Sequence, residues 1–277
     1  MSSSQERVRL AEETLEVLRR GQYPCGGSAV TLPDLSPMLR GTRLYTPLEA
    51  PRLRDALHTA RGQHQTTVQV TGEDTFAAAR RLHTRFGPVT ALNFASAKNP
   101  GGGFLGGAKA QEEDLARCSA LYLSLTAPEA EFYYLANLAN GTPLYTDHLI
   151  YSPDVPVFRD SAAAFLPAPV LVNVITAPAP NAGAVLDRHP TLFREVPRVL
   201  RERATLVLGL AALMNQRNLI LGAWGCGVFL NDPAVVAETF RELLATDAAG
   251  AFENVVFAVL DTQPRQRVLR AFEQILG

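Results

Sequence analysis

The sequence has few cysteines and no long apolar run, and both shortages exclude classes of protein. Only Cys25, Cys118 and Cys226 occur in 277 residues; they are odd in number and none belongs to a CxxC pair. This usage argues against a disulfide framework and against a zinc site. The longest apolar stretch, ATLVLGLAALM, is too short to cross a bilayer.

The chain also lacks an excess of either charge. Twenty-six Lys and Arg against 27 Asp and Glu give a net charge of −1, so no surface field gathers long nucleic acids by counterion release. A polyanionic partner would need a local site, and direct DNA binding is not expected. The N-terminus, MSSSQERVRLAEE, has no apolar segment typical of a secretory signal, so a cytoplasmic location without membrane association is expected. The five histidines show no HExxH or paired spacing, and we expect no metal and no cofactor.

Residues 1–64 differ in pattern from the rest of the chain. The segment QERVRLAEETLEVLRRGQY has apolar residues at helical spacing and predicts a helix that ends at Gly21. A turn-rich stretch follows, and PLEAPRLRDALHTAR predicts a second helix. We interpret residues 1–64 as an N-terminal helical accessory segment.

From residue 65 to residue 277, expected strands alternate with expected helices. TTVQV, PVTALNFA, HLIYS, PVFRD, APVLVNVITA, NLILGAW and ENVVFAVLD predict strands. Helices are predicted for DTFAAARRLHTRF, AKAQEEDLARCSALYLSL, the long segment at 191–217, PAVVAETFRELLAT and QRVLRAFEQIL. Such alternation predicts an α/β fold with helices on both faces of a mostly parallel or mixed sheet.

Two glycine-rich loops each follow an expected strand and precede an expected helix. Loop 99–107 contains GGGFLGG, and loop 222–233 reads GAWGCGVFLNDP. Ligands of open α/β sheets bind beyond the carboxyl ends of the strands, where glycines let backbone N–H groups approach phosphate oxygens. Neither loop is a Walker A motif or a proper GxGxxG motif. For either loop alone, a tight connection is an equally good interpretation.

Carboxylates follow the first loop directly. Gln111, Glu112, Glu113 and Asp114 open the next expected helix, where acidic residues also complement the helix dipole. Adjacent helical residues point about 100° apart, so we expect the two glutamates to face different ways. Because the apolar stripe of this helix runs beside them, at least one should be enclosed, with its pKa raised as suits a general acid.

The combined pattern of GGG, seven residues and QEE resembles the signature of the poly(ADP-ribose) glycohydrolases, and of their compact bacterial-type members in particular. The VTGEDT, ITAPAPN and GAWGCGVF segments are also similar to those of a macrodomain. The resemblance covers residues 65–277. It implies a macrodomain-like three-layer α/β/α fold with a mixed central sheet.

In this family the second glutamate of QEE is the catalytic acid, which falls on Glu113. It would protonate the leaving oxygen of a ribose–ribose O-glycosidic bond and then activate water, while Glu112 would hold ribose hydroxyls. The resemblance thus implies a monomeric hydrolase that releases ADP-ribose from poly(ADP-ribose). Its partners would be ADP-ribosylated proteins, whose modification it reverses in the DNA damage response.

The resemblance places substrate contacts on both loops, at QEE and after the first strand. The residues are Asn99, Gly101, Gly102, Gly103, Gln111, Gly225, Cys226, Gly227, Val228, Phe229, Glu73 and Asp74. Glu73 or Asp74 would bind the adenine amino group, although Asp74 could equally be only a helix cap. Phe229 would pack over the ribose or anchor the loop. Thr176 and Asn181 are expected in a ligand-facing loop, and Trp224 is expected to pack.

Other functions compatible with the same residues are a non-catalytic ADP-ribose-binding module and a hydrolase for a single ADP-ribose on protein. A pure binding module has no need of the QEE carboxylates, which favours an enzyme. The sequence leaves open whether cleavage occurs only at the end of the polymer or also within it.

Overall fold

The computed structural model describes residues 3–277 and contains one large mixed sheet. The strand order is β3-β6-β7-β5-β8-β9-β4. The strands are β3 (Arg43–Tyr45), β4 (Thr67–Thr71), β5 (Thr90–Phe94), β6 (Leu149–Arg159), β7 (Phe165–Ala177), β8 (Asn218–Gly222) and β9 (Asn254–Ala258). Neighbours from β7 to β4 are parallel, whereas β6 is antiparallel to both β7 and β3. The α/β class and the mixed sheet predicted from the sequence are confirmed.

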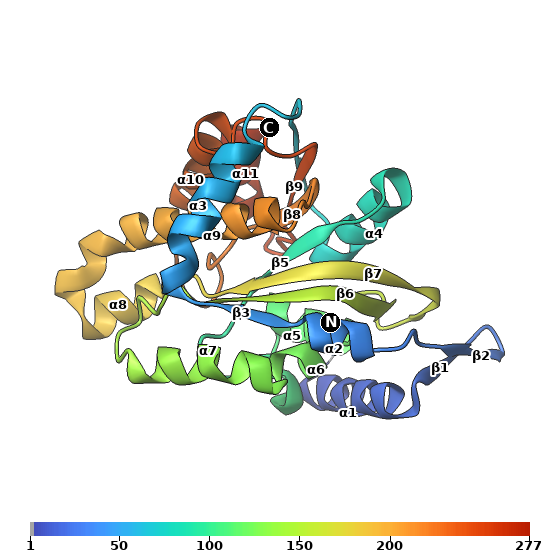
Figure 1. The fold of residues 1–277 in the computed structure, drawn as a ribbon. Coiled ribbons are helices and arrows are strands. Elements are labelled where there is room, and N and C mark those ends of the chain that lie inside the picture. Colours follow the sequence, from blue (N-terminus) through green and yellow to red (C-terminus); the bar gives the residue numbers. More distant parts are fainter. Residues whose placement is uncertain (1–2) are drawn as a thin grey trace.

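Helices cover both faces of the sheet and make three layers (Figure 1). The helices α3, α9, α10 and α11 lie on one face, and α1, α5, α6 and α7 lie on the other. The helices are α1 (Ser4–Arg20), α2 (Ser36–Gly41), α3 (Ala50–Ala60), α4 (Thr75–Phe86), α5 (Gln111–Cys118), α6 (Leu121–Leu125), α7 (Pro128–Ala139), α8 (Ala182–Arg188), α9 (Val196–Leu213), α10 (Pro233–Ala245) and α11 (Arg267–Leu276). Short 3-10 turns are η1 (Pro47–Glu49), η2 (Phe104–Gly106) and η3 (Pro190–Glu195).

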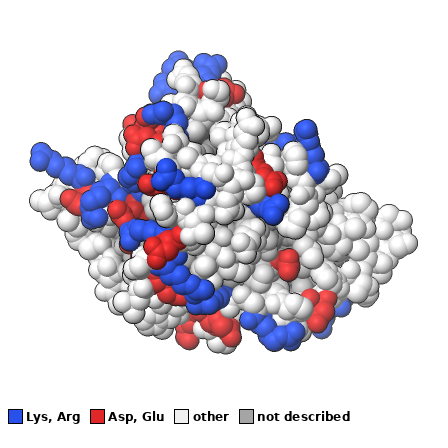
Figure 2. Space-filling view, turned by 45° about the horizontal axis from the view of Figure 1, so that its top comes forward, with Lys and Arg blue, Asp and Glu red and all other residues white. Residues whose placement is uncertain are grey.

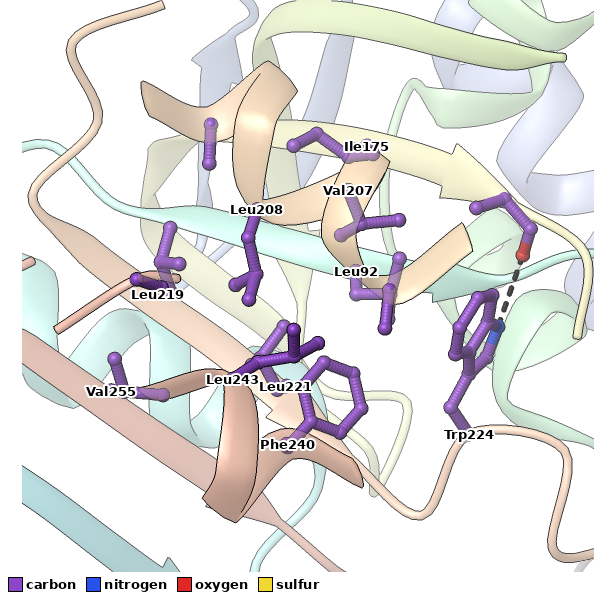
Figure 3. Packing of buried hydrophobic residues seen from close by; sticks show 14 of the residues in the cluster. Leu92, Ile175, Val207, Leu208, Leu219, Leu221, Trp224, Phe240, Leu243 and Val255 are labelled. Atoms are coloured by element: carbon purple, nitrogen blue, oxygen red, sulfur yellow. Dashed lines mark hydrogen bonds between the residues drawn. The ribbon is translucent and has the colours of Figure 1, made fainter. Parts of the chain in front are cut away.

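Strand residues divide between two cores because successive side chains of a strand point to opposite faces. On β8, Leu219 and Leu221 belong to the core beneath α9 and α10, and Ile220 belongs to the core beneath α4 and α5. Figure 3 shows the first of these cores, where Leu92 of β5 packs near Val207 of α9. Both faces of the central strands are therefore buried, which explains why the sequences of these strands are almost continuously apolar.

Residues 3–64 contribute more than the expected helices. The helix α1 ends at Gly21 in the left-handed conformation, as predicted. The segment also contains the hairpin β1 (Gln22–Cys25) and β2 (Ser28–Thr31), and β3 is an edge strand of the large sheet. Leu53 and Leu57 of α3 are fully buried in the core shared with α9. The domain boundary near residue 64 stays a prediction. Residues 1 and 2 of the N-terminal segment lie outside the described part of the chain.

The segment 108–125 is not one helix as predicted. It forms α5 and α6, which are separated at Ser119, whose hydroxyl donates to Leu115 O (2.7 Å) and accepts from Leu121 N (3.1 Å). Ala120 N donates to Pro156 O on β6, so the chain leaves the helix to contact the sheet. The two strands expected at 148–160 are a single strand, β6, with irregular pairing to β7.

The surface carries mixed charge. On the face shown in Figure 2, basic and acidic side chains are interspersed, and a wide area has neither. No helix within residues 3–277 combines the length and the apolar character needed to span a bilayer.

Candidate active site

The two glycine loops lie at the same edge of the sheet. Loop 95–110 leaves the end of β5 and loop 223–232 leaves the end of β8, and these strands are parallel neighbours. Their carboxyl ends therefore bring the loops side by side, as the strand–loop–helix pattern predicts. The helix α5, which carries QEE, begins where the first loop ends.

Gln111 fixes the first turn of α5 to the sheet. Its Oε1 accepts from the N–H of Phe94 (2.8 Å), and its Nε2 donates to Leu92 O (2.8 Å) and to the hydroxyl of Thr75 (3.1 Å). The side chain thus joins the end of β5 to the start of α4. Glu112 and Glu113, which follow Gln111 in α5, are therefore held close to this edge of the sheet.

Glu112 is buried, with 2% of its surface exposed, and both of its carboxyl oxygens have partners in the protein. Oε1 accepts from Asn93 Nδ2 (3.2 Å), and Oε2 accepts from the N–H of Ser96 (2.6 Å). Burial raises the pKa of Glu112 to about 8, and the neighbouring Glu113 adds to the shift, while the hydrogen bonds from Ser96 and Asn93 oppose it. The raised pKa expected at this site falls on Glu112.

Glu113 is also buried, with 8% of its surface exposed, but only one of its oxygens is occupied. Oε1 accepts from the N–H of Gly103 (2.8 Å). Among residues 3–277, Oε2 has no hydrogen-bond partner. Because buried carboxyl oxygens normally find partners, this unpaired oxygen distinguishes Glu113 from Glu112.

The two carboxyl groups converge, contrary to the expectation that they face different ways. A Cβ at Gly102 would overlap Oε1 of Glu113 and lie 3.1 Å from Oε2 of Glu112. Long glutamate side chains bend toward the loop, which folds back over the first turn of α5. Gly102 also has φ +59°, so both its conformation and its surroundings require glycine.

Two polar residues of the strands lie at the site, and of these Asn93 was not predicted as a site residue. Asn93 of β5 and Thr176 of β7 are fully buried, and Asn93 Nδ2 donates to Thr176 Oγ1 (3.2 Å) as well as to Glu112. Thr176 was expected in a ligand-facing loop, but it lies within β7. The signal in the sequence is a polar residue that interrupts an otherwise apolar strand. Asn181, expected in the same loop, caps α8 by accepting from Ala184 N.

Asn99 and the remaining glycines of the first loop form its outer turn. The side chain of Asn99 is exposed, its N–H donates to Ser96 Oγ (3.1 Å), and its carbonyl accepts from Gly102 N (2.9 Å). Gly101 has φ +66°, and a Cβ there would lie 2.9 Å from the ring of Tyr122. The loop therefore approaches the carboxylates closely only because it lacks side chains.

The second loop presents free backbone N–H groups. Within residues 3–277, the N–H groups of Gly227, Val228 and Phe229 donate no hydrogen bond, and Val228 is 78% exposed. Gly225 has φ +74°, and a Cβ there would overlap Nδ2 of Asn231. The half-buried Cys226 has a pKa of about 12, raised by burial, so its thiol is not a nucleophile near neutral pH.

Aromatic residues of the second loop are anchored in the protein. Trp224 is fully buried, and its Nε1 donates to Ala177 O (3.1 Å; dashed line in Figure 3). Its predicted packing role is confirmed. Phe229 is half-buried against the core, with its ring 5.9 Å from that of Tyr145. This contact leaves both interpretations of Phe229 open.

The acidic pair after β4 is already engaged locally. Asp74 caps α4 by accepting from Ala77 N (2.8 Å), and Glu73 pairs with Arg81 on the surface. Thr75 nevertheless contacts Gln111, which brings this segment beside the QEE helix.

Taken together, the geometry provides an acid or base with one free oxygen, a second carboxyl held by the protein, and N–H groups suited to phosphates. A buried carboxyl beside such groups can transfer a proton to or from a bound sugar oxygen. In the part of the chain that the structure describes, no three His, Cys, Asp or Glu side chains are grouped to hold a metal ion.

Comparisons with known proteins relate the chain to one family. Residues 11–160 match the family model of the microbial-type PARG catalytic domain. The chain is 62% identical to poly(ADP-ribose) glycohydrolase (PARG) from Deinococcus radiodurans solved with ADP-ribose, over 88% of this chain and 98% of that one, with a TM-score of 0.86.

The enzyme from Thermomonospora curvata, solved bound to the inhibitor ADP-HPD, is 48% identical, over 98% of this chain and 99% of that one, with a TM-score of 0.90. Another structure of the same enzyme superimposes with a TM-score of 0.93 at 48% identity and covers 98% of this chain and 100% of that one. No curated protein matches the chain. The family resemblance stated from the GGG and QEE motifs is confirmed.

Proposed function

Because the chain belongs to the microbial-type poly(ADP-ribose) glycohydrolase family, we propose that it hydrolyses the ribose–ribose O-glycosidic bonds of poly(ADP-ribose) and releases ADP-ribose. Membership makes it a glycoside hydrolase. The observation that carries the proposed mechanism is the free, buried Oε2 of Glu113 beside the glycine loop.

Glu113 acts as the general acid and then as the general base. In its acid form it gives a proton to the oxygen of the leaving ribose, while the bond from that oxygen to the anomeric carbon breaks and its electron pair goes to the oxygen. The ribosyl cation left behind is attacked by water, and the Glu113 carboxylate takes the proton that the water loses. One carboxyl group thus serves both steps, unlike the pair used by most glycosidases.

Glu112 positions the substrate ribose. Its raised pKa alone would suit a general acid, but both of its oxygens accept hydrogen bonds from the protein. Glu113 has the free oxygen, and hydrogen-bond reach takes precedence over pKa in choosing the acid. The carboxyl group of Glu112 can still hold a ribose hydroxyl.

The two loops hold the diphosphate and the riboses. The free N–H groups of Gly227, Val228 and Phe229 support a diphosphate site at the second loop, with Gly225 and Cys226 shaping its turn. In the first loop, Gly101, Gly102 and Gly103 line the ribose, and Asn99 contacts it. Glu73 or Asp74, beside Gln111, would bind adenine, and Phe229 packs against the ribose.

We propose that the protein works as a monomer in the cytoplasm and removes the polymer from ADP-ribosylated proteins during the DNA damage response. Gel filtration and fractionation of cell extracts test the first two points.

Incubating the protein with labelled poly(ADP-ribose) and measuring free ADP-ribose tests the function. We expect Glu113→Gln to abolish release while ADP-ribose binding, measured by calorimetry, is kept. Normal turnover by that variant would show that Glu113 is not the acid. If wild type binds ADP-ribose but releases none from the polymer, it is a binding module. Release only from mono-modified glutamate would identify a mono-ADP-ribosyl hydrolase.

A further inference from the structure

The N-terminal helix α1 lies against the glycine loop that covers the two glutamates. Arg7 Nε donates to the carbonyl of Gly107 (2.7 Å). Gly107 has φ +73°; a Cβ there would overlap the carbonyl of Ser4 and lie 2.9 Å from Cγ2 of Val8. The first turns of α1 and this end of the loop therefore fit only because residue 107 is glycine. The family match begins at residue 11, so Arg7 lies outside the matched catalytic domain.

Apolar packing extends this contact along α1. Ala11 of α1, Phe104 of η2 and Ala116 of α5 form a small buried cluster, against which Leu15 and Tyr122 pack. The rings of Phe104 and Tyr122 are 5.0 Å apart. The loop is therefore enclosed between α1 on one side and α5 and α6 on the other.

Hydrogen bonds from α1 also reach α5. Thr14 Oγ1 donates to the carbonyl of Arg117 (2.7 Å), and Nη1 of the buried Arg117 donates to Ala108 O (2.9 Å). These bonds hold the second half of the loop, from residue 104 to residue 108, to two helices.

A short path connects the Arg7 contact to Glu113. The N–H groups of Gly106 and Ala108 both donate to the carbonyl of Gly103, at 3.0 and 3.1 Å. The N–H of Gly103 in turn donates to Oε1 of Glu113 (2.8 Å). Because Gly107 lies between the two donors, a shift of Gly107 reaches residue 103, whose N–H orients the Glu113 carboxylate.

We propose that α1 is a positioning element of the active site, and that the Arg7–Gly107 hydrogen bond holds the loop so that Gly103 orients Glu113. Arg7 is a positioning residue that acts through the loop. The proposal rests on the proposed function in so far as Glu113 performs the chemistry. It assigns part of the N-terminal segment to catalysis, although that segment carries none of the motif residues.

Arg7→Ala in the full chain, assayed on labelled poly(ADP-ribose) well below its melting temperature, tests the proposal. We expect kcat to fall by about 10- to 100-fold, since a small misplacement of a catalytic group has such effects, with KM little changed. Arg7→Lys, which can still donate to Gly107, should recover part of the loss. The matched control is Arg9→Ala, on the exposed side of the same helix, and it should leave kcat unchanged.

Amide hydrogen exchange gives a readout that does not depend on turnover. Arg7→Ala should speed exchange at Gly103, Gly106 and Ala108 and leave the amides of β5 and β8 protected. Unchanged kcat, or equal losses in the Arg7 and Arg9 variants, would overturn the proposal, as would unchanged exchange in the loop. If wild type shows no turnover, the proposed function fails, and the exchange data still decide whether α1 holds the loop.

Discussion

The N–H of Gly103 donates a 2.8 Å hydrogen bond to Oε1 of Glu113, while Oε2 of the same carboxyl group has no partner within residues 3–277. One oxygen fixes the orientation of the group, and the other is buried and unpaired. The neighbouring Glu112 is held at both oxygens. The QEE helix thus carries two buried carboxyl groups with different hydrogen-bonding states, and four predictions follow from how they and the loops are held.

Gly102→Ala should reduce kcat/KM by about 100-fold, because the added Cβ displaces the Glu113 carboxylate. The positive φ adds about 1–2 kcal/mol of destabilisation. Polymer hydrolysis and thermal melting measure the two effects. Gly106→Ala is the control, because a Cβ there meets no atom within 4 Å and φ is not positive. Similar losses in both variants would contradict the prediction.

Glu112→Gln should change how stability depends on pH. Burial, with a contribution from Glu113, raises the pKa of Glu112 from 4.5 to about 8, so the folded protein keeps a proton that the unfolded chain has lost. The free energy of unfolding contributed by this group therefore falls as pH rises from about 4.5 to about 8 and is level outside that window. A glutamine side chain does not titrate, so the variant lacks this pH-dependent contribution to the free energy of unfolding.

Melting temperatures of wild type and Glu112→Gln, measured between about pH 4 and pH 9, test this sign. The melting temperature of Glu112→Gln should rise relative to that of wild type between about pH 4.5 and about pH 8, and the difference should be level above that range. A constant difference at every pH would mean that Glu112 is not protonated in the folded protein.

Asn93→Ala should raise the pKa of Glu112 further, because the hydrogen bond from Asn93 lowers it. The pH window of the stability change should then extend upward, and we expect kcat/KM to fall by about tenfold as the Glu112 carboxyl moves. Loss of the buried amide should cost about 1–3 kcal/mol. Asn218→Ala removes a buried amide that donates to Pro88 O; it should destabilise without moving the window. A window that moves equally in both variants would disprove the link between Asn93 and Glu112.

Gly225→Ala should weaken ADP-ribose binding by about tenfold or more, equivalent to about 1.4 kcal/mol. The new Cβ would overlap Asn231 Nδ2 and lie 2.6 Å from Ala179 Cβ, which moves the second loop and its free N–H groups. Titration calorimetry measures the affinity. Gly87→Ala is the control for backbone strain alone, because its φ is +83° and a Cβ there meets no atom within 4 Å. Equal affinities of the two variants for ADP-ribose would show that the geometry of the second loop does not affect binding.

Local features of the structure were predictable because they depend on nearby residues. Gly21 ends α1, and Asp232 caps α10. Period-two and helical patterns identified most strands and helices. The helix α7 has a weak apolar periodicity and was not anticipated.

The motif by which the family was identified is local, because the spacing from GGG to QEE is carried in one continuous segment. A strand, a glycine loop and a helix N-terminus must follow one another in space as they do in the chain. The sequence alone therefore determined the α/β class, the family and the two candidate glutamates.

Tertiary structure decided how those glutamates differ. The contact of Asn93 with Thr176 joins residues 83 positions apart, and that of Arg7 with Gly107 joins residues 100 positions apart. Both depend on strand order, register and helix docking, which no local pattern specifies. Within residues 3–277, one oxygen of Glu113 is unpaired while both oxygens of Glu112 are held, because the donors come from the loop and the strands, which only folding brings together.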